Sequence, residues 1–196
     1  MTFSIVALDP TTKALGVATA TGNPYVGNRV PHIKKAVGAI ATQGLTNISY
    51  GINGLKLLEA GLPPLEILKK LLQHDPKRDY RQVIIIDIHG RKAAFTGKRN
   101  IDYKGHIIGK NYIVAGNLLA RRNVLNEMAK AFEKQRRFVE KLLSALEAGR
   151  KAGGDIRGER STALIVIPYK NDKPIDLRVN DHPNPIKELR RIFEGK

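Results

Sequence analysis

Asp181 and His182 are adjacent in the sequence, and both residue types can coordinate a metal ion. No residue near them in the sequence completes a site, and a turn leading into Asn184 and Pro185 explains the pair better. His106 has a side chain whose usual pKa suits acid–base chemistry, although a lone histidine more often has a structural role. We therefore expect no metal site and no cofactor.

The chain contains no cysteine. This excludes disulfides, thiolate metal sites and a cysteine nucleophile, and leaves hydroxyl, amine, carboxylate and imidazole chemistry. The sequence also lacks a P-loop, a dinucleotide-binding fingerprint and the GxSxG motif of serine hydrolases. Several common classes of enzyme are thus excluded.

The charge balance is strongly basic, with 34 Lys and Arg against 18 Asp and Glu. The basic residues are scattered from Lys13 to Lys196, and their densest stretch, 133–141, also contains acidic residues. Such a pattern indicates a solvated surface that binds polyanions weakly, so we expect no specific nucleic-acid partner. Without a leader-like segment or a long apolar run, we also expect a cytoplasmic protein with no membrane partner.

The apolar patterning predicts a single domain over residues 1–196. Strands are predicted at 2–8, 14–20, 35–42, 81–88, 91–96, 107–109, 112–115, 161–167 and 175–179. Helices are predicted as a pair broken at 61–64, as a long helix or pair over 124–151 that ends at Gly153 and Gly154, and as a last helix capped at Asn184. Strand groups separated by helix pairs favour two sheets stacked face to face under outer helices.

Several blocks of the sequence resemble the N-terminal nucleophile (Ntn) hydrolase superfamily, which includes the proteasome β-subunits. They are the opening Met-Thr, the first hairpin, Lys34 and Lys35, the small residues 38–44 and the late segment 153–161. Nearly the whole chain is similar to one uncharacterised bacterial and archaeal family in that superfamily, domain of unknown function 1028. The matching blocks are Thr2-Phe-Ser-Ile-Val-Ala, Ala41-Thr-Gln, Asn47-Ile-Ser-Tyr-Gly, Phe95-Thr-Gly, Ala115-Gly-Asn-Leu and Asp176-Leu-Arg-Val-Asn-Asp-His-Pro. The resemblance implies an α+β fold, a four-layer αββα sandwich, and no particular substrate.

The resemblance implies a catalytic role for Thr2. In the superfamily an N-terminal Thr, Ser or Cys attacks an amide carbonyl, and its own α-amine, with a pKa near 8, acts as the base. Thr2 takes this place only if Met1 is removed, because a retained Met1 turns the amine into an amide. The alternative is that Thr2 is simply the first β-branched residue of a strand.

A lysine on the third strand lowers the pKa of the nucleophile in proteasome-like members, and the resemblance assigns this role to Lys35. The aspartate that accompanies it on the second strand has no counterpart, because residues 16–21 contain no carboxylate. A solvated lysine at a strand end is an equally good interpretation of Lys35.

The resemblance also suggests an oxyanion and substrate-binding segment. The backbone N–H of Thr42 would face the oxyanion, and the Gln43 and Asn47 amides would hold the substrate. Asn117 and His106 lie in segments that border the same cleft. The alternative is a polar strand end whose groups satisfy their own loop.

The late polar segment, with Asp155, Arg157 and Ser161, resembles the superfamily's support for the nucleophile, although a glycine-rich helix exit explains Gly153 and Gly154 equally well.

Two functions follow. The first is an amide-bond hydrolase acting on an unknown small amide or peptide, and the second is a non-catalytic binding or assembly protein that retains the sandwich. Self-association as a dimer is expected in both cases, because the superfamily commonly forms oligomers.

Overall fold

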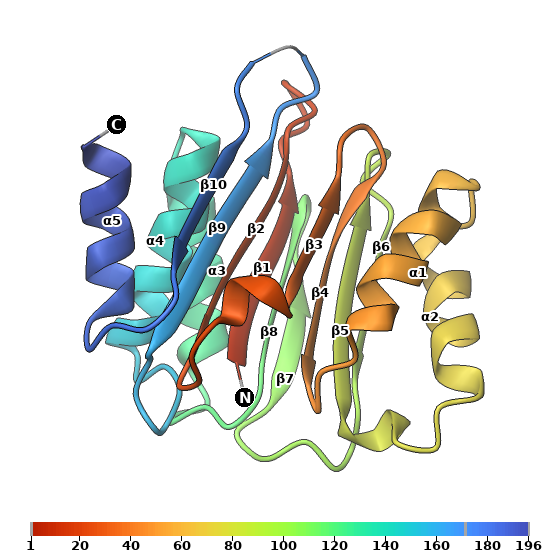
Figure 1. Cartoon of the computed structure of the whole chain (residues 1–196), viewed down its shortest axis with the longest axis horizontal. Coiled ribbons are helices and arrows are strands. Elements are labelled where there is room, and N and C mark those ends of the chain that lie inside the picture. Colours follow the sequence, from red (N-terminus) through yellow and green to blue (C-terminus); the bar gives the residue numbers. More distant parts are fainter. Residues whose placement is uncertain (1, 171, 196) are drawn as a thin grey trace.

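The computed structural model describes residues 2–170 and 172–195, which form two antiparallel β-sheets and five α-helices (Figure 1). The strands are β1 (Thr2–Leu8), β2 (Leu15–Thr21), β3 (Pro31–Lys34), β4 (Gly38–Gly44), β5 (Arg81–Asp87), β6 (Lys92–Thr96), β7 (Gly105–Ile108), β8 (Tyr112–Gly116), β9 (Ser161–Ile167) and β10 (Ile175–Val179). The helices are α1 (Ile48–Glu59), α2 (Pro64–Gln73), α3 (Val124–Lys134), α4 (Phe138–Lys151) and α5 (Pro185–Glu194). No helix among these residues is long and apolar enough to cross a bilayer.

The larger sheet has the strand order β10-β9-β2-β1-β8-β7, and the smaller has the order β3-β4-β5-β6. The N-terminal hairpin predicted from the sequence is confirmed, with Thr2 opposite Thr21 and Leu8 opposite Leu15. The two predicted helix pairs are confirmed as well, and the first is broken where Pro64 begins α2. Both sheets are thus antiparallel, as the strand pattern indicated.

The side chains of β1 alternate between two apolar clusters, because successive residues of a strand point to opposite faces. Phe3 and Ile5 pack in a cluster that includes residues of α3, α4 and α5. Val6 packs instead with Ile84 and Ile86 of the smaller sheet. The larger sheet therefore contacts helices on one face and the smaller sheet on the other.

The smaller sheet is also covered on both faces. Val83 and Ile85 of β5 pack in a third cluster, together with Leu58 of α1 and Ile67 of α2. Figure 1 shows α1 and α2 on the outer side of this sheet and α3, α4 and α5 on the outer side of the larger one. The elements therefore place a layer of apolar contacts between the two sheets, and the candidate site lies at one end of that layer.

Two local predictions were wrong. The strand predicted at 35–42 begins only at Gly38; Lys35 lies in a turn where Ala36 has a φ of 58°, and an additional strand, β3, precedes that turn. Asn184 precedes α5, but its side chain makes no capping hydrogen bond and instead accepts one from Arg150 at 2.6 Å. Both errors concern the boundaries of elements: the first is a turn made by a positive φ, and the second is a side-chain contact that replaces the helix cap.

A partly buried ion pair joins the loop after α2 to the start of β5. Arg81 Nε donates to Asp75 Oδ2 at 2.7 Å, and the Tyr50 hydroxyl of α1 donates to the same oxygen at 2.6 Å. The hydrogen bond from Arg81 is the main cause that lowers the pKa of Asp75 to about 2, and the bonds from Tyr50 and the Lys77 amide act in the same direction against desolvation. Arg81 also donates to the carbonyl of Leu45, so the pair fixes the segment that follows β4.

We predict an acid-dependent loss of stability through Asp75. Because its folded pKa lies below its unfolded value near 4, the ion pair stabilises the fold above about pH 4, and this contribution disappears as the pH falls towards 2. The free energy of unfolding of Asp75→Asn should be lower by roughly 1–3 kcal/mol at pH 7 and fall less steeply between pH 5 and 2. Urea unfolding across this pH range measures both effects. Asp102→Asn, at an exposed aspartate, is the control and should follow the wild type; equal steepness in wild type and Asp75→Asn would contradict the assignment.

Candidate functional site

One end of the layer between the sheets is polar, although the rest of that layer is apolar. Strand alternation places Gln43 on the same face as Ala41 in β4, and Gln82 on the same face as Ile84 in β5. Both glutamines and Ser4 of β1 are fully buried, and Ser4 Oγ donates to Gln43 Oε1 at 2.5 Å. Three strands from two sheets therefore contribute polar side chains to one buried network.

Thr2 begins β1 at this polar end and is 4% exposed. Its carbonyl oxygen accepts hydrogen bonds from the backbone N–H of Asn117 at 3.1 Å and from Gln43 Nε2 at 3.2 Å. The Thr2 backbone is thus held both by β4 and by the segment after β8. Met1, on whose removal the catalytic interpretation depends, lies outside the described residues.

Gln82 lies at the centre of the network. Its Oε1 accepts from Gln43 Nε2 and from Asn117 Nδ2, each at 2.7 Å. Its Nε2 lies 2.9 Å from the carbonyl oxygens of both Gly105 and Gly116. One side chain of the smaller sheet thereby contacts the ends of two strands of the larger sheet.

A cavity of about 270 Å³ shares Asn117 with this network. Its lining consists of Asn23, Gly44, Leu45, Tyr80, Arg99, Asn100, Ile101 and Asn117. Asn117 is fully buried, and its Oδ1 meets no donor among the described residues. An unsatisfied buried acceptor costs about 1–3 kcal/mol, so a ligand that supplies a donor there would recover that loss.

His106 of β7 contacts the outer edge of the network. Its Nδ1 lies 2.9 Å from Thr96 Oγ1, which lies 2.9 Å from Gln82 Nε2. The residue is exposed, yet neighbouring groups desolvate part of its ring, which lowers the pKa of His106. The imidazole is therefore biased towards its neutral form, and it is not among the residues that line the cavity around Asn117.

Thr42 and Asn47 make contacts other than those expected of them. Alternation turns Thr42 away from the layer between the sheets, and its backbone N–H donates to Val30 O at 3.1 Å. That N–H is therefore not available to an oxyanion. Asn47 caps α1, since its Oδ1 accepts from the Ser49 N–H at 3.1 Å, and its carbonyl accepts from Thr42 Oγ1 at 3.2 Å. Of this segment, Gln43 alone reaches the network.

Lys35 is also not brought next to Thr2. Lys35 follows β3 in the turn before Gly38, the first residue of β4. Gln43 lies five residues after Gly38, which at the usual strand rise is a distance of roughly 17 Å along β4. Figure 1 shows the turn between β3 and β4 at the upper end of the sheets and the start of β1 at the lower end. The expected tuning of Thr2 by Lys35 is therefore not supported by its position.

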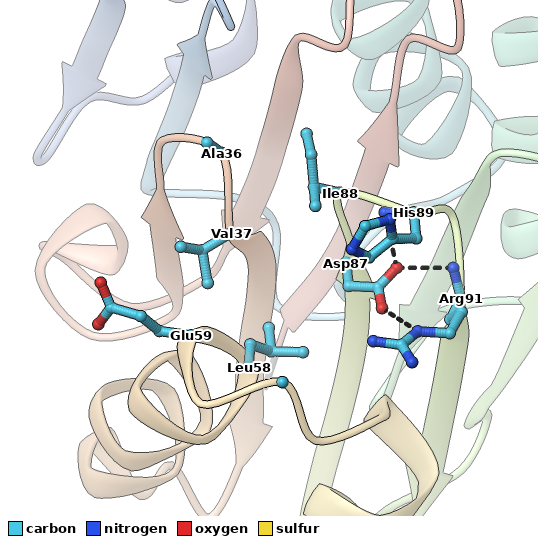
Figure 2. A pocket seen from close by; sticks show the side chains of 9 residues that line it. Ala36, Val37, Leu58, Glu59, Asp87, Ile88, His89 and Arg91 are labelled. Carbon is cyan, nitrogen blue, oxygen red and sulfur yellow. Dashed lines mark hydrogen bonds and ion pairs between the residues drawn. The ribbon is translucent and has the colours of Figure 1, made fainter.

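A larger cavity, of about 640 Å³, adjoins the turn that contains Lys35 (Figure 2). Asp87 lines this cavity, is 2% exposed and accepts hydrogen bonds from the backbone N–H groups of His89 at 3.0 Å and Arg91 at 2.8 Å. Arg91 Nε also donates to Asp87 Oδ2 at 2.5 Å. Asp87 thus holds the turn between β5 and β6, and the cavity's size does not make it the better candidate site.

The late polar segment supports the wall of the smaller cavity. Asp155 is buried, accepts from the Gly22 N–H at 2.9 Å and forms an ion pair with Arg157 at 2.7 Å. Arg157 Nη1 donates to Asn23 Oδ1 at 3.1 Å, and Ser161 Oγ donates to the Asn23 carbonyl at 2.5 Å. These residues hold Asn23, which lines the cavity, rather than Thr2 itself.

Asp181 and His182 have structural contacts. Asp181 accepts two hydrogen bonds from Arg160, at 2.9 and 2.5 Å, and His182 Nδ1 accepts from the Asn184 N–H at 3.0 Å. Both side chains are therefore engaged in contacts with their neighbours before α5. Within residues 2–170 and 172–195, no group of three or more His, Asp or Glu side chains could hold a metal ion.

Sequence reasoning missed Ser4 and Gln82. Each is a polar residue at a position whose parity matches the apolar residues of its strand that face the other sheet. That parity was a usable signal, since a polar side chain facing a buried layer needs a partner. The cavity residues Tyr80, Arg99 and Ile101 come from connecting segments and gave no comparable signal.

We predict that Gln82→Leu destabilises the protein by roughly 2–4 kcal/mol, because Asn117 Nδ2 and the carbonyls near Gln82 Nε2 lose a buried partner. Chemical denaturation of the purified protein measures the change. Gln73→Leu makes the same substitution at an exposed position and should stay within about 0.5 kcal/mol of the wild type. If the two variants were equally stable, the network would not hold the sheets together.

Comparison with known proteins identifies relatives. The model of DUF1028, a family of unknown function, matches residues 2–189. The crystal structure of protein SPO2555 from Silicibacter pomeroyi, itself described by that family, is 36% identical with a TM-score of 0.93, over 99% of this chain and 85% of the other. Anbu (ancestral beta-subunit) from Yersinia bercovieri is 10% identical over an alignment that covers 100% of this chain and 93% of the Anbu chain. Its TM-score of 0.44 is too low to assign a shared fold. No curated protein matches. By the family model and by its similarity to SPO2555, the chain belongs to DUF1028.

Proposed function

We propose that this chain is a single-domain Ntn-type hydrolase with a four-layer αββα sandwich, and that Thr2 cleaves an unidentified amide bond after removal of Met1. The layered arrangement is supported by three apolar clusters: one includes residues of α3 to α5, one contains residues of both sheets, and one includes residues of α1 and α2. The position of Thr2 carries the proposed chemistry. It starts a central strand, two donors hold its carbonyl, and one of them, Asn117, also lines a cavity.

In the proposed reaction the α-amine of Thr2 takes the proton from its own Oγ as that oxygen attacks the amide carbonyl. The amine half of the substrate leaves with a proton, and the acyl group stays on Oγ as an ester. Water then cleaves the ester, releases a carboxylic acid and restores the hydroxyl. Base and nucleophile come from one residue, so the reaction does not require Lys35 at the site.

A non-catalytic binding or assembly protein is the second candidate. It is favoured by the positions of Lys35 and Thr42, since neither the lysine nor the Thr42 N–H is available next to Thr2. In this case the cavity around Asn117 binds a ligand without turnover. Dimerisation and a cytoplasmic location stay predictions under both functions.

We predict that Thr2→Ala abolishes turnover of any amide that the wild type cleaves in a substrate panel, without unfolding the protein, because a small residue remains at the start of β1. A form that retains Met1 should be equally inactive, since an acylated nitrogen cannot accept the proton. Product release, measured by mass spectrometry, compares the three forms.

The matched control is Thr11→Ala, at an exposed threonine in the turn between β1 and β2, which should keep wild-type activity. Equal turnover by wild type, Thr2→Ala and the Met1-retaining form would refute the Thr2 mechanism. Met1 present in all of the protein isolated from its own cell would favour the binding protein.

A further inference from the structure

The cavity around Asn117 has features that select a ligand. We propose that it binds a small secondary amide that has an apolar side chain and a carboxylate next to the amide, as in an N-acylated apolar amino acid or the C-terminal residue of a short peptide. This rests on the proposed function and deepens it by naming a substrate class, because Asn117 lines the cavity and its backbone N–H also holds the Thr2 carbonyl. Its test, however, is binding, which does not require turnover.

The unsatisfied acceptor in the cavity calls for an N–H donor. Asn117 Nδ2 is committed to Gln82 Oε1, which fixes the orientation of the side chain and leaves Oδ1 as the end without a partner. Across the lining, Asn23 Oδ1 is bound by Arg157, so its Nδ2 is the end that can donate to a ligand carbonyl. An acceptor and a donor on two fixed side chains match the N–H and C=O of a secondary amide.

The rim of the cavity is apolar and exposed. Leu45, Tyr80 and Ile101 are 48%, 40% and 51% exposed, and all three line the cavity. The Leu45 N–H donates to Tyr80 O at 2.9 Å, and Arg81 donates to the Leu45 carbonyl, so this part of the rim is held in place. A ligand with a medium-sized apolar side chain would cover these residues, whereas glycine would leave them exposed.

Arg99 supplies a cation at the same cavity. Its Nη1 donates to the Tyr80 hydroxyl at 3.2 Å, and its guanidinium lies 5.5 Å from the Tyr80 ring centre. These contacts hold the guanidinium at the apolar rim, where its remaining N–H groups can meet a carboxylate. The net charge of +16 also favours the approach of anionic ligands.

The size of the cavity limits the ligand. At about 270 Å³ it falls below the range of roughly 300–1,000 Å³ that is typical of drug-sized molecules. A single acylated amino acid or one terminal peptide residue is therefore the expected unit.

The test measures binding of N-acetyl-leucine to the full-length Thr2→Ala protein by titration calorimetry and by shifts of backbone amide resonances. We expect saturable binding with shifts at Leu45, Arg99 and Asn117. Three analogues each remove one group: N-acetyl-leucinamide lacks the carboxylate, N-acetylglycine lacks the apolar side chain, and the ester isostere lacks the N–H. Each should bind about fivefold more weakly. Alanyl-leucine with an acetylated N-terminus tests whether a peptide C-terminus binds better than the single amino acid.

Arg99→Met should remove the preference for N-acetyl-leucine over its neutral amide and leave binding of the amide unchanged. Lys98→Met is the matched control, because it removes one positive charge from the neighbouring position outside the cavity lining, and the preference should persist. Absence of saturable binding by both the single amino acid and the peptide, shifts confined to other regions, or equal binding of the acid and the amide would overturn the inference.

Turnover of the same compounds by the wild type separates this inference from the proposed function. Preferential binding without cleavage leaves the ligand class standing and favours the non-catalytic binding protein. Cleavage without preference for the carboxylate supports the hydrolase and refutes the ligand class.

Discussion

The two hydrogen bonds that Gln82 Oε1 accepts from Gln43 and Asn117 constrain the arrangement of the sheets. They lie in a buried layer, where a paired amide is strong and an unpaired one is costly. A shift of β5 by one residue would turn Gln82 towards α1 and α2 and bring Arg81 or Val83 into its place in the network. Register, sheet stacking and the polar end of the layer are therefore coupled through one side chain. The position of Thr2 depends on them, because Gln43 and Asn117 also hold its carbonyl.

The start of β5 controls both sides of the candidate site. Arg81 and Gln82 are consecutive, so they point to opposite faces of the sheet. Gln82 orients Asn117 within the layer between the sheets, while Arg81, paired with Asp75, fixes the Leu45 carbonyl. Both Asn117 and Leu45 line the cavity. The pair of neighbouring residues thus links the interior of the fold to the rim of the site.

Hydrophobic patterning gave the N-terminal hairpin, the helix pairs and the antiparallel sheets correctly, because burial on alternate faces leaves a clear period in the sequence. It failed at Lys35, where an apolar run continues across a turn that Ala36 makes with a positive φ. It also could not show which of Thr42 and Gln43 belongs to the candidate site, since that depends on the face of β4 to which each side chain points. The cavity could not be predicted, as its lining comes from segments that are far apart in the chain and meet only in the folded protein.

The described contacts of Thr2 O come from an amide side chain and a backbone N–H, and the side chains around them are glutamines, an asparagine and hydroxyls. These groups do not titrate between pH 4 and 10, so they can orient Thr2 but cannot exchange protons with it. In the proposed hydrolase the α-amine, rather than any of these groups, would therefore be the base. A charged lysine is not needed to position Thr2 here, because buried amides already hold its backbone. The network is compatible with either function, and what distinguishes them is the covalent state of the Thr2 nitrogen.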